Sequence, residues 1–226
     1  MAINDPSQLE KARLEDVLME LLYGKYDLTF HGGTCIWRCY NGNRFSRDLD
    51  FYMSAPGKEG MERFRELSEL LVKWGFTLKE KGYSNVTNTM HFLVESTAKM
   101  KIDINFDYKK GSPIEYTRVD GSKITVLGLT PLELLNEKID AYGNKMARAH
   151  KYSIPEVQDL YDMYHLVSLA GKDARTAGHL AKLIGAIKND PPQNLRSLDH
   201  LILAGVAPSF ELMIKRIERW IDDNKQ

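Results

Sequence analysis

The chain has 226 residues, of which 43% are hydrophobic and 27% charged, proportions of an ordinary globular protein with one large domain or two small ones. Lysine plus arginine (31) equals aspartate plus glutamate (31), so the net charge argues neither for nor against a nucleic-acid partner. No apolar run approaches the roughly 20 residues that span a bilayer, and residues 1–22 lack the apolar core of a signal peptide, which predicts a cytoplasmic protein without membrane contact.

The first part of the chain alternates between helix and strand patterns. Asp5 and Pro6 predict the start of a helix, with an apolar stripe from Leu14 through Val17 to Leu22. The other predicted elements follow in this order: a strand at 28–31, a helix at 34–40, a strand at 48–53, a helix at 61–74 that stops at Gly75, strands at 76–81, 89–96 and 99–108, and a hairpin of 114–119 and 123–128.

From Thr130 the hydrophobic period becomes that of helices. Thr130 and Glu133 form a capping box, with Pro131 at the first helical position. Helices are predicted from there past Tyr142, from Ser153–Glu156 to Gly171, and at about 173–189, 195–204 and 209–223. The sequence therefore predicts an α+β fold, with a mixed-sheet core in residues 1–128 followed by a C-terminal helical bundle in residues 129–226.

Residues 44–51, "RFSRDLDF", place two acids on one face of a predicted strand. Asp48 and Asp50 point to one side and the alternate apolar residues to the other. Side chains at i and i+2 lie about 7 Å apart at the backbone, so both carboxylates can converge on hard divalent cations, which prefer oxygen ligands. Two such ions stabilise the attacking and leaving oxygens of a phosphoryl displacement. A solvated edge strand with two surface acids is the alternative interpretation.

Asp103 is a third acid in the middle of a predicted strand. Met100, Ile102, Ile104 and Phe106 share the opposite face of that strand. If this strand lies next to residues 48–53 in the sheet, all three carboxylates meet.

The segment "FHGGT" joins a predicted strand to a predicted helix. Gly32, Gly33 and Thr34 then offer backbone N–H groups and a hydroxyl at a helix N-terminus, where anions bind well. A plain tight turn is the alternative. His31, Cys35 and Cys39 have a spacing that invites zinc, but the glycines interrupt the helix and no further cysteine completes the site, which favours two semi-buried thiols on a short helix.

The glycine turn, the Asp-x-Asp strand and the later strand aspartate together resemble the polymerase-beta-like nucleotidyltransferase superfamily. Within it, "FHGGTCIWRCYNGNRFSRDLDF" resembles the first two motifs of the AbiEii/AbiGii-type toxin nucleotidyltransferases. "NEKIDAY", with Lys138, is similar to their helical lysine motif, and "VQDLYDMYHL", with Asp159, to their closing helical motif. Gln158 departs from the family, because a basic residue often precedes that aspartate; Lys145 or Arg148 could substitute.

The resemblance implies a nucleotidyltransferase core and assigns roles to its residues. Asp48 and Asp50 would hold Mg²⁺ or Mn²⁺, while Asp103 would be a third metal ligand or the base for the attacking hydroxyl. The glycine turn (Gly32, Gly33 and Thr34) would cradle the phosphates of the NTP.

Basic residues would complete the site. Arg44 and Ser46 would donate to phosphate, or Arg44 would neutralise the acid pair. Lys138 would bind the triphosphate, with Asp159 beside it, and the helical domain would thereby complete the cleft. The alternatives are a solvated Lys138 that pairs with Glu137 or Asp140, and a solvated helix face for Asp159, Asp162 and His165.

We expect a metal-dependent nucleotidyltransferase that transfers the NMP of an NTP to an acceptor. The resemblance implies the toxin of a toxin–antitoxin or phage-defence pair, with a cognate antitoxin as partner and RNA such as tRNA, or a protein, as acceptor. The alternative is a catalytically silent nucleotide-binding or partner-binding module of the same fold.

Overall fold

The computed structural model describes residues 3–54, 59–148 and 156–225, so the helix start predicted near Ser153 lies outside the described residues. The chain divides into two compact units. The sheet unit comprises residues 1–41 and 45–129, and the helical unit comprises residues 42–44 and 130–226.

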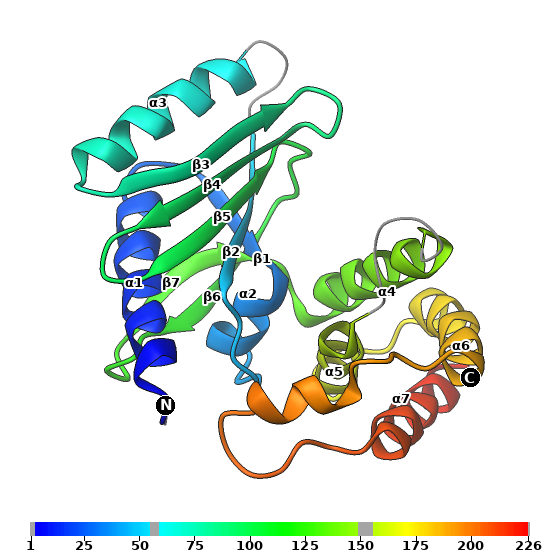
Figure 1. Ribbon diagram of the computed structural model, residues 1–226. Coiled ribbons are helices and arrows are strands. Elements are labelled where there is room, and N and C mark those ends of the chain that lie inside the picture. Colours follow the sequence, from blue (N-terminus) through cyan, green and yellow to red (C-terminus); the bar gives the residue numbers. More distant parts are fainter. Residues whose placement is uncertain (1–2, 55–58, 149–155, 226) are drawn as a thin grey trace. The chain divides into compact units, whose positions relative to one another are not determined.

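The sheet unit contains one mixed sheet flanked by helices (Figure 1). Its described elements are α1 (Pro6–Tyr23), β1 (Leu28–His31), α2 (Gly32–Cys39), β2 (Asp48–Met53), α3 (Glu59–Lys73), β3 (Thr77–Ser84), β4 (Thr89–Glu95), β5 (Lys99–Asn105), β6 (Ser112–Thr117) and β7 (Lys123–Gly128). The described strands have the order β3-β4-β5-β2-β1-β7-β6. At the centre of this sheet, β2 runs parallel to β5 and antiparallel to β1.

The apolar side of the central strands is the core of the sheet unit. Leu49 and Phe51 alternate with the acids of β2 and are fully buried. Helices α1 and α3 cover this side, because Tyr23 packs edge-on against Phe51 at 6.0 Å and Phe64 stacks on Phe92 at 5.4 Å between ring centroids. The opposite side of β2 and β5 is therefore free to carry polar groups.

Local signals fix several helix ends as predicted. Asp5 caps α1 by accepting a hydrogen bond from the backbone N–H of Ser7 at 2.7 Å, and Gly75 follows α3 with φ +91°, a conformation that favours glycine. The predicted apolar stripe of α1 was wrong at Val17, whose exposed fraction is 49%. The buried face of α1 instead includes Glu15 and Met19.

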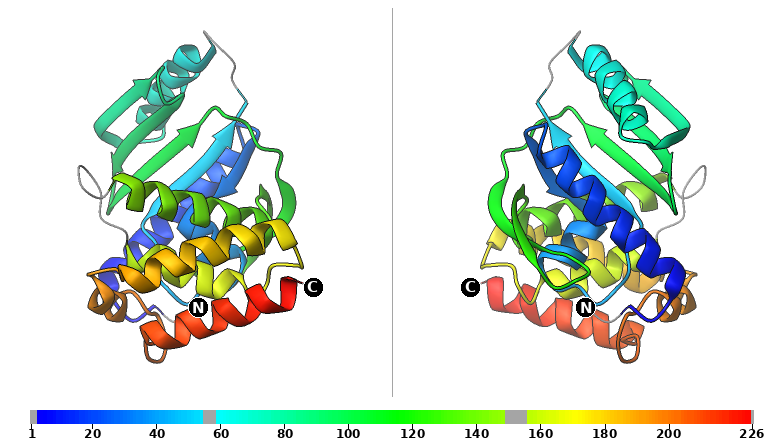
Figure 2. Two further views of the ribbon diagram at one scale, coloured as in Figure 1. Left: turned by 90° about the vertical axis from the view of Figure 1, so that its right-hand side faces the viewer. Right: turned by 90° about the vertical axis from the view of Figure 1, so that its left-hand side faces the viewer.

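The helical unit packs its helices in pairs, with α5 against α4 and α7, and α6 against α4 and α7; Figure 2 shows α6 and α7 side by side. Its described elements are α4 (Pro131–Arg148), α5 (Val157–Leu166), α6 (Ala174–Asn189), the 3₁₀ helix η1 (Leu195–His200) and α7 (Phe210–Asn224). The capping box at the start of α4 is present, since Glu133 accepts from the backbone N–H of Thr130 at 2.8 Å.

The helix predicted at 195–204 is shorter than expected. Only the 3₁₀ helix η1 forms, and the chain then leaves the helical path because Ile202 bridges to Arg44 and the backbone N–H of Leu203 donates to the carbonyl of Asn43 at 3.1 Å. These partners lie far away in the sequence, which a local pattern does not reveal. Across the described part of the chain, no helix combines the length and the apolar character needed to cross a membrane.

Candidate active site

Two carboxylates and two imidazoles form one row across four neighbouring strands. Asp50 on β2 lies opposite Asp103 on β5. On the outer sides of this pair, His31 on β1 lies opposite Asp50, and His91 on β4 lies opposite Asp103. Residues opposite each other in adjacent strands share a face, so all four side chains lie on the side of the sheet away from α1 and α3. The strand of Asp103 therefore lies next to the strand of Asp48 and Asp50, as predicted.

Asp48 extends the row by one step along β2. It shares the face of Asp50, two residues on, and lies opposite Lys101 on β5. We call Asp48, Asp50 and Asp103 the acidic cluster. The ammonium of Lys101 donates a hydrogen bond to Oδ2 of Asp103, so a lysine supplies the positive charge that stands between these repelling acids.

The charges of the acidic cluster and of Lys101 affect each other. Burial raises the pKa of the Asp48 carboxyl; the Lys101 ammonium opposes this rise and Asp103 adds to it. Burial by itself would lower the pKa of Lys101, but its hydrogen bond to Asp103 and the surrounding carboxylates outweigh burial and raise that pKa. Lys101 therefore stays protonated at neutral pH.

The glycine turn lies directly against Asp50. Gly32 has φ +75°, and a Cβ on this residue would lie only 2.2 Å from Oδ2 of Asp50. Glycine is therefore required here both by the backbone conformation and by the space that the carboxylate fills. The glycine pair forms the first turn of α2, whose N-cap residue His31 makes no side-chain cap hydrogen bond. The start of α2 thus keeps backbone N–H groups close to Asp50.

Thr34 has a different role from the one expected for its hydroxyl. Its side chain is fully buried, and Oγ1 donates to the backbone carbonyl of Asp48 at 2.6 Å. This bond ties α2 to the start of β2. The Thr34 hydroxyl is buried and its proton is already donated to this carbonyl. Only the backbone N–H of Thr34 could therefore donate to a phosphate.

Arg38 anchors the far end of α2. Its guanidinium is buried between the rings of Trp37 and Tyr116, at 4.8 and 4.9 Å from their centroids, and forms an ion pair with Asp16 of α1. Such cation–π contacts are strongest where water is excluded. The helix that carries the glycine turn is thereby fixed to both α1 and β6. Of the thiols on α2, Cys35 is buried and Cys39 is half-buried.

A cavity of about 320 Å³ opens on the polar face of the sheet. Its lining combines the row of acids and histidines with neighbouring residues of β2, β4 and β5: His31, Asp50, Phe51, Thr89, His91, Lys101, Asp103, Ile104 and Asn105. Lys101, His31 and His91 were not predicted to belong to the site. Strand alternation puts each of them on a face, but it does not say which residue of the next strand it opposes.

The donor atoms of the acidic cluster suit a hard divalent cation. Mg²⁺ and Mn²⁺ bind carboxylate oxygens, and three carboxylates share this face. Among the residues that the structure describes, however, no group of three or more His, Cys, Asp or Glu side chains is arranged to hold a metal ion. Oδ2 of Asp103 is bonded to the Lys101 ammonium instead. The ligand type fits, whereas binding requires the carboxylates to converge and Lys101 to move.

Arg44 is bonded to a partner that sequence reasoning did not assign to it. Its guanidinium donates to both carboxylate oxygens of Asp162, from Nε at 2.6 Å and from Nη2 at 2.5 Å. Arg44 thus takes part in a buried bidentate ion pair within the helical unit, while its two expected roles, phosphate donor and neutraliser of the acid pair, stay predictions. Ser46 is half-buried in the segment that precedes β2.

Five charged side chains form an ion-pair network in the helical unit: Arg44, Lys138, Lys145, Asp159 and Asp162. Nζ of Lys138 lies 2.8 Å from Asp162 and 2.9 Å from Asp159. Nζ of Lys145 donates to Asp159 at 2.7 Å, so Lys145 is the basic residue next to this aspartate, where Gln158 departs from the family motif. The side chain of Arg148 lies outside the described residues.

The two alternatives, a solvated Lys138 and a solvated helix face for Asp159 and Asp162, were wrong. Lys138 is not a solvated residue paired with Glu137 or Asp140, because its stem is buried and its ammonium contacts two aspartates of α5. Asp159 and Asp162 do not form a solvated face, since both are buried. Removal of Lys138 is therefore expected to destabilise the helical unit, because the buried carboxylates of Asp159 and Asp162 would each lose one of their cationic partners.

The ion-pair network predicts how stability depends on pH. Burial by itself raises the pKa of Asp159, but the Lys138 and Lys145 ammoniums outweigh it and lower that pKa from 3.8 to about 2. A lowered pKa contributes stability that is present above the unfolded value and lost as the pH falls through the folded value. We expect this carboxylate to contribute about 2 kcal/mol at neutral pH.

Chemical denaturation of the wild type and of Asp159→Asn between pH 6 and pH 2 measures this contribution. The difference between their free energies of unfolding should be largest above pH 4 and should shrink by about 2 kcal/mol as the pH falls to 2. A difference that does not change with pH would contradict the assignment.

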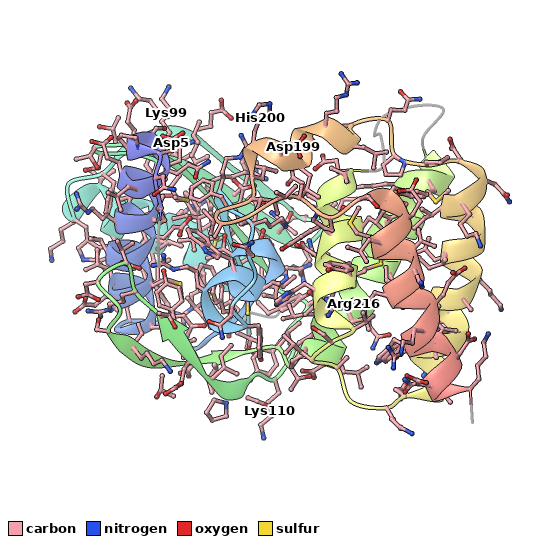
Figure 3. The ribbon with its side chains drawn as sticks, turned by 90° about the horizontal axis from the view of Figure 1, so that it is seen from below. Asp5, Lys99, Lys110, Asp199, His200 and Arg216 are labelled. Carbon is pink, nitrogen blue, oxygen red and sulfur yellow. The ribbon has the colours of Figure 1, made fainter. Side chains whose placement is uncertain are left out.

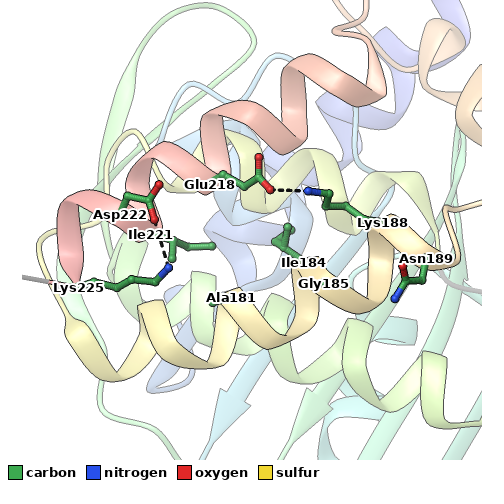
Figure 4. A pocket seen from close by; sticks show the side chains of 9 residues that line it. All are labelled: Ala181, Ile184, Gly185, Lys188, Asn189, Glu218, Ile221, Asp222 and Lys225. Carbon is green, nitrogen blue, oxygen red and sulfur yellow. Dashed lines mark hydrogen bonds and ion pairs between the residues drawn. The ribbon is translucent and has the colours of Figure 1, made fainter.

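A second hollow, of about 480 Å³, lies in the helical unit between α6 and α7 (Figure 4). None of the predicted site residues lines it, and its charged side chains are paired: Lys188 with Glu218 and Lys225 with Asp222.

On α7, Arg216 (Figure 3) lies over the ring of Tyr164 at 4.7 Å. Tyr142 and Tyr161 are buried, as expected for core residues.

Solved structures share the fold of this chain. JHP933 from Helicobacter pylori superposes with a TM-score of 0.63 at 16% identity, covering 98% of this chain and 93% of its own. MenT4, a nucleotidyltransferase toxin from Mycobacterium tuberculosis H37Rv, superposes with a TM-score of 0.57 at 21% identity, covering 96% and 86%. At these identities the likeness establishes the fold alone.

The sequence itself identifies the family. The family described as the nucleotidyl transferase AbiEii toxin of type IV toxin–antitoxin systems matches residues 19–221. The chain belongs to this family, and it is a nucleotidyltransferase, as its sequence motifs predicted. The search of curated protein sequences returned no match.

Proposed function

We propose that the sheet unit transfers a nucleoside monophosphate from an NTP to an acceptor hydroxyl and releases pyrophosphate. The observation that carries this proposal is the pairing of Asp50 with Asp103 across β2 and β5, with the glycine turn of Gly32 directly against Asp50. Carboxylates of the kind that bind a divalent cation and a glycine turn of the kind that holds phosphate are therefore neighbours.

The residue types support a division of labour within the site. Asp48 and Asp50 would hold Mg²⁺ or Mn²⁺, and such an ion would neutralise the charge that develops on the transferring phosphoryl group. The backbone N–H groups of Gly32 and Gly33 would position the phosphates. Asp103 would act either as a third ligand or as the base that accepts the proton of the acceptor hydroxyl.

The acceptor and the partner follow from the family rather than from the site. We propose RNA such as tRNA, or a protein, as the acceptor, and a cognate antitoxin as the partner of this chain. The balanced net charge does not favour RNA over protein. Lys138 and Asp159 remain candidates for a role in turnover, although their charges already stabilise the helical unit through the ion-pair network.

Nucleotide binding should depend on the metal. Calorimetry with ATP, CTP, GTP and UTP is expected to detect binding in the presence of Mg²⁺ or Mn²⁺ and little without it, because the repelling charges of triphosphate and acids are bridged only by a cation. Incubation with each radiolabelled NTP, either metal, and total RNA or cell lysate then reveals the labelled acceptor. Equal nucleotide affinity with and without metal would contradict the proposal.

A silent nucleotide-binding module would behave differently in the same two experiments. It would bind an NTP with metal but would label no acceptor and would release no pyrophosphate. Release of labelled pyrophosphate therefore separates an enzyme from a binding module even before the acceptor has been identified.

A further inference from the structure

We propose that Lys101 is a built-in counter-cation of the acidic cluster, which a divalent metal must displace, so that this lysine sets the metal affinity of the site. The inference rests on the proposed function, because it requires that the acidic cluster binds a metal ion. It assigns to Lys101 a role that neither the strand pattern nor the family motifs indicate.

The position of Lys101 is defined by the register of the sheet. On β5 it lies opposite Asp48 of β2 and two residues before Asp103, so its side chain shares the face of the whole acidic cluster. Its ammonium is hydrogen-bonded to Oδ2 of Asp103 and interacts electrostatically with Asp48 and Asp50 as well. A single cation thus serves all three acids, and it lines the same cavity as two of them.

A metal ion and this ammonium compete for the same carboxylate oxygens. The ammonium has three donors and binds oxygen lone pairs, which are the ligands that a divalent cation requires. Two cations at this spacing also repel each other, so the metal cannot simply be added to the arrangement described. Either Lys101 turns away when the metal binds, or the metal binds weakly.

Lys101 can turn away at small cost. Its side chain is 50% exposed, and a lysine ammonium sits on a flexible four-carbon stem. The backbone of β5 is paired on both sides, with β4 and with β2, so the movement is confined to the side chain. The acidic cluster can therefore exist in two states, one in which Lys101 offsets part of its negative charge and one in which a metal ion does.

Two other roles for Lys101 lead to different results. If Lys101 only stabilises the sheet by a cross-strand ion pair, its removal lowers stability and leaves metal affinity unchanged. If Lys101 binds the triphosphate, its removal weakens NTP binding and again leaves the affinity for metal alone unchanged. Metal binding without nucleotide is therefore the measurement that separates the three roles.

The test measures Mn²⁺ binding to the nucleotide-free protein by calorimetry. Lys101→Met should bind Mn²⁺ at least about tenfold more tightly than the wild type, because it removes the competing charge. Lys123→Met is the matched control, since Lys123 is also an exposed strand lysine, 54% exposed, paired with one carboxylate, Glu115, at 2.6 Å. Its affinity for Mn²⁺ should equal that of the wild type. Lys101→Gln repeats the test with a polar replacement.

Thermal unfolding gives a second readout. Without metal, Lys101→Met should melt below Lys123→Met, since its acids repel each other uncompensated. Added Mn²⁺ should raise the Tm of Lys101→Met more than that of the wild type, because a tighter ligand stabilises the folded state more.

The double variant Lys101→Met/Asp50→Asn locates the effect, and it should lose the gain in affinity. An affinity of Lys101→Met equal to or below that of the wild type, with Asp50→Asn still weakening Mn²⁺ binding, would overturn the role of Lys101 and leave the proposed function intact. Mn²⁺ binding that is the same in Asp50→Asn and in the wild type would overturn both.

Discussion

Replacing Asp162 by alanine is expected to destabilise the helical unit by about 3 to 5 kcal/mol, the cost of removing one partner from a buried ion pair. Asp162 is fully buried and neutralises two cations at once, Arg44 through two hydrogen bonds and Lys138 through a contact of 2.8 Å. Without it, a guanidinium and an ammonium remain in a buried environment with less counter-charge.

The matched control is Asp222→Ala. Asp222 also accepts from a lysine, Lys225 at 3.2 Å, but its side chain is 73% exposed, and exposed pairs contribute about 1 kcal/mol or less. Urea denaturation of both variants compares the two costs directly. A loss for Asp162→Ala as small as that for Asp222→Ala would show that the ion-pair network does not hold the helical unit together.

Asp50→Asn should lower the rate of nucleotidyl transfer by at least about a hundredfold while the protein stays folded, as for removal of one group that stabilises transition-state charge. The substitution keeps the shape of the side chain against Gly32 but removes the charge that a cation requires. The rate of pyrophosphate release from radiolabelled NTP is the measurement, with circular dichroism to confirm the fold.

Asp107→Asn is the matched control for this loss. Asp107 follows β5, is exposed, and accepts a hydrogen bond from the side chain of Asn88 at 3.0 Å, so the same change of charge is made near the sheet but outside the acidic cluster. Its rate should stay near that of the wild type. If both variants lose activity equally, the effect is one of overall charge and the role proposed for Asp50 fails.

The sequence predicted the strands of the sheet unit and the three acids well, for a physical reason. Alternation along one strand is a local property, and the apolar partners of Asp48, Asp50 and Asp103 reveal which face each acid takes. Helix caps such as Asp5 and Thr130 are equally local. The acid on β5 could therefore be matched to those on β2 from the sequence, although the register of the two strands could not.

Interactions between distant segments were not predictable in the same way. Arg44 lies only four residues before Asp48 in the sequence, which suggested a phosphate or the acid pair as its partner, yet it bonds Asp162, 118 residues away. Lys101 was visible on the polar face of its strand, but only the register places it opposite Asp48. The predicted length of the helix at 195–204 was wrong for the same reason, because the end of this helix depends on Asn43 and Arg44.

The parallel pairing of β2 with β5 has a consequence for how the protein is made. Parallel neighbours cannot be joined by a tight turn, and here α3 and the β3–β4 pair lie between them in the chain. Contacts between distant segments form late and slowly, because a large loop must close first. During synthesis, the acids of β2 emerge from the ribosome well before Asp103. A growing chain therefore has no complete acidic cluster until β5 has been made and has paired with both β4 and β2.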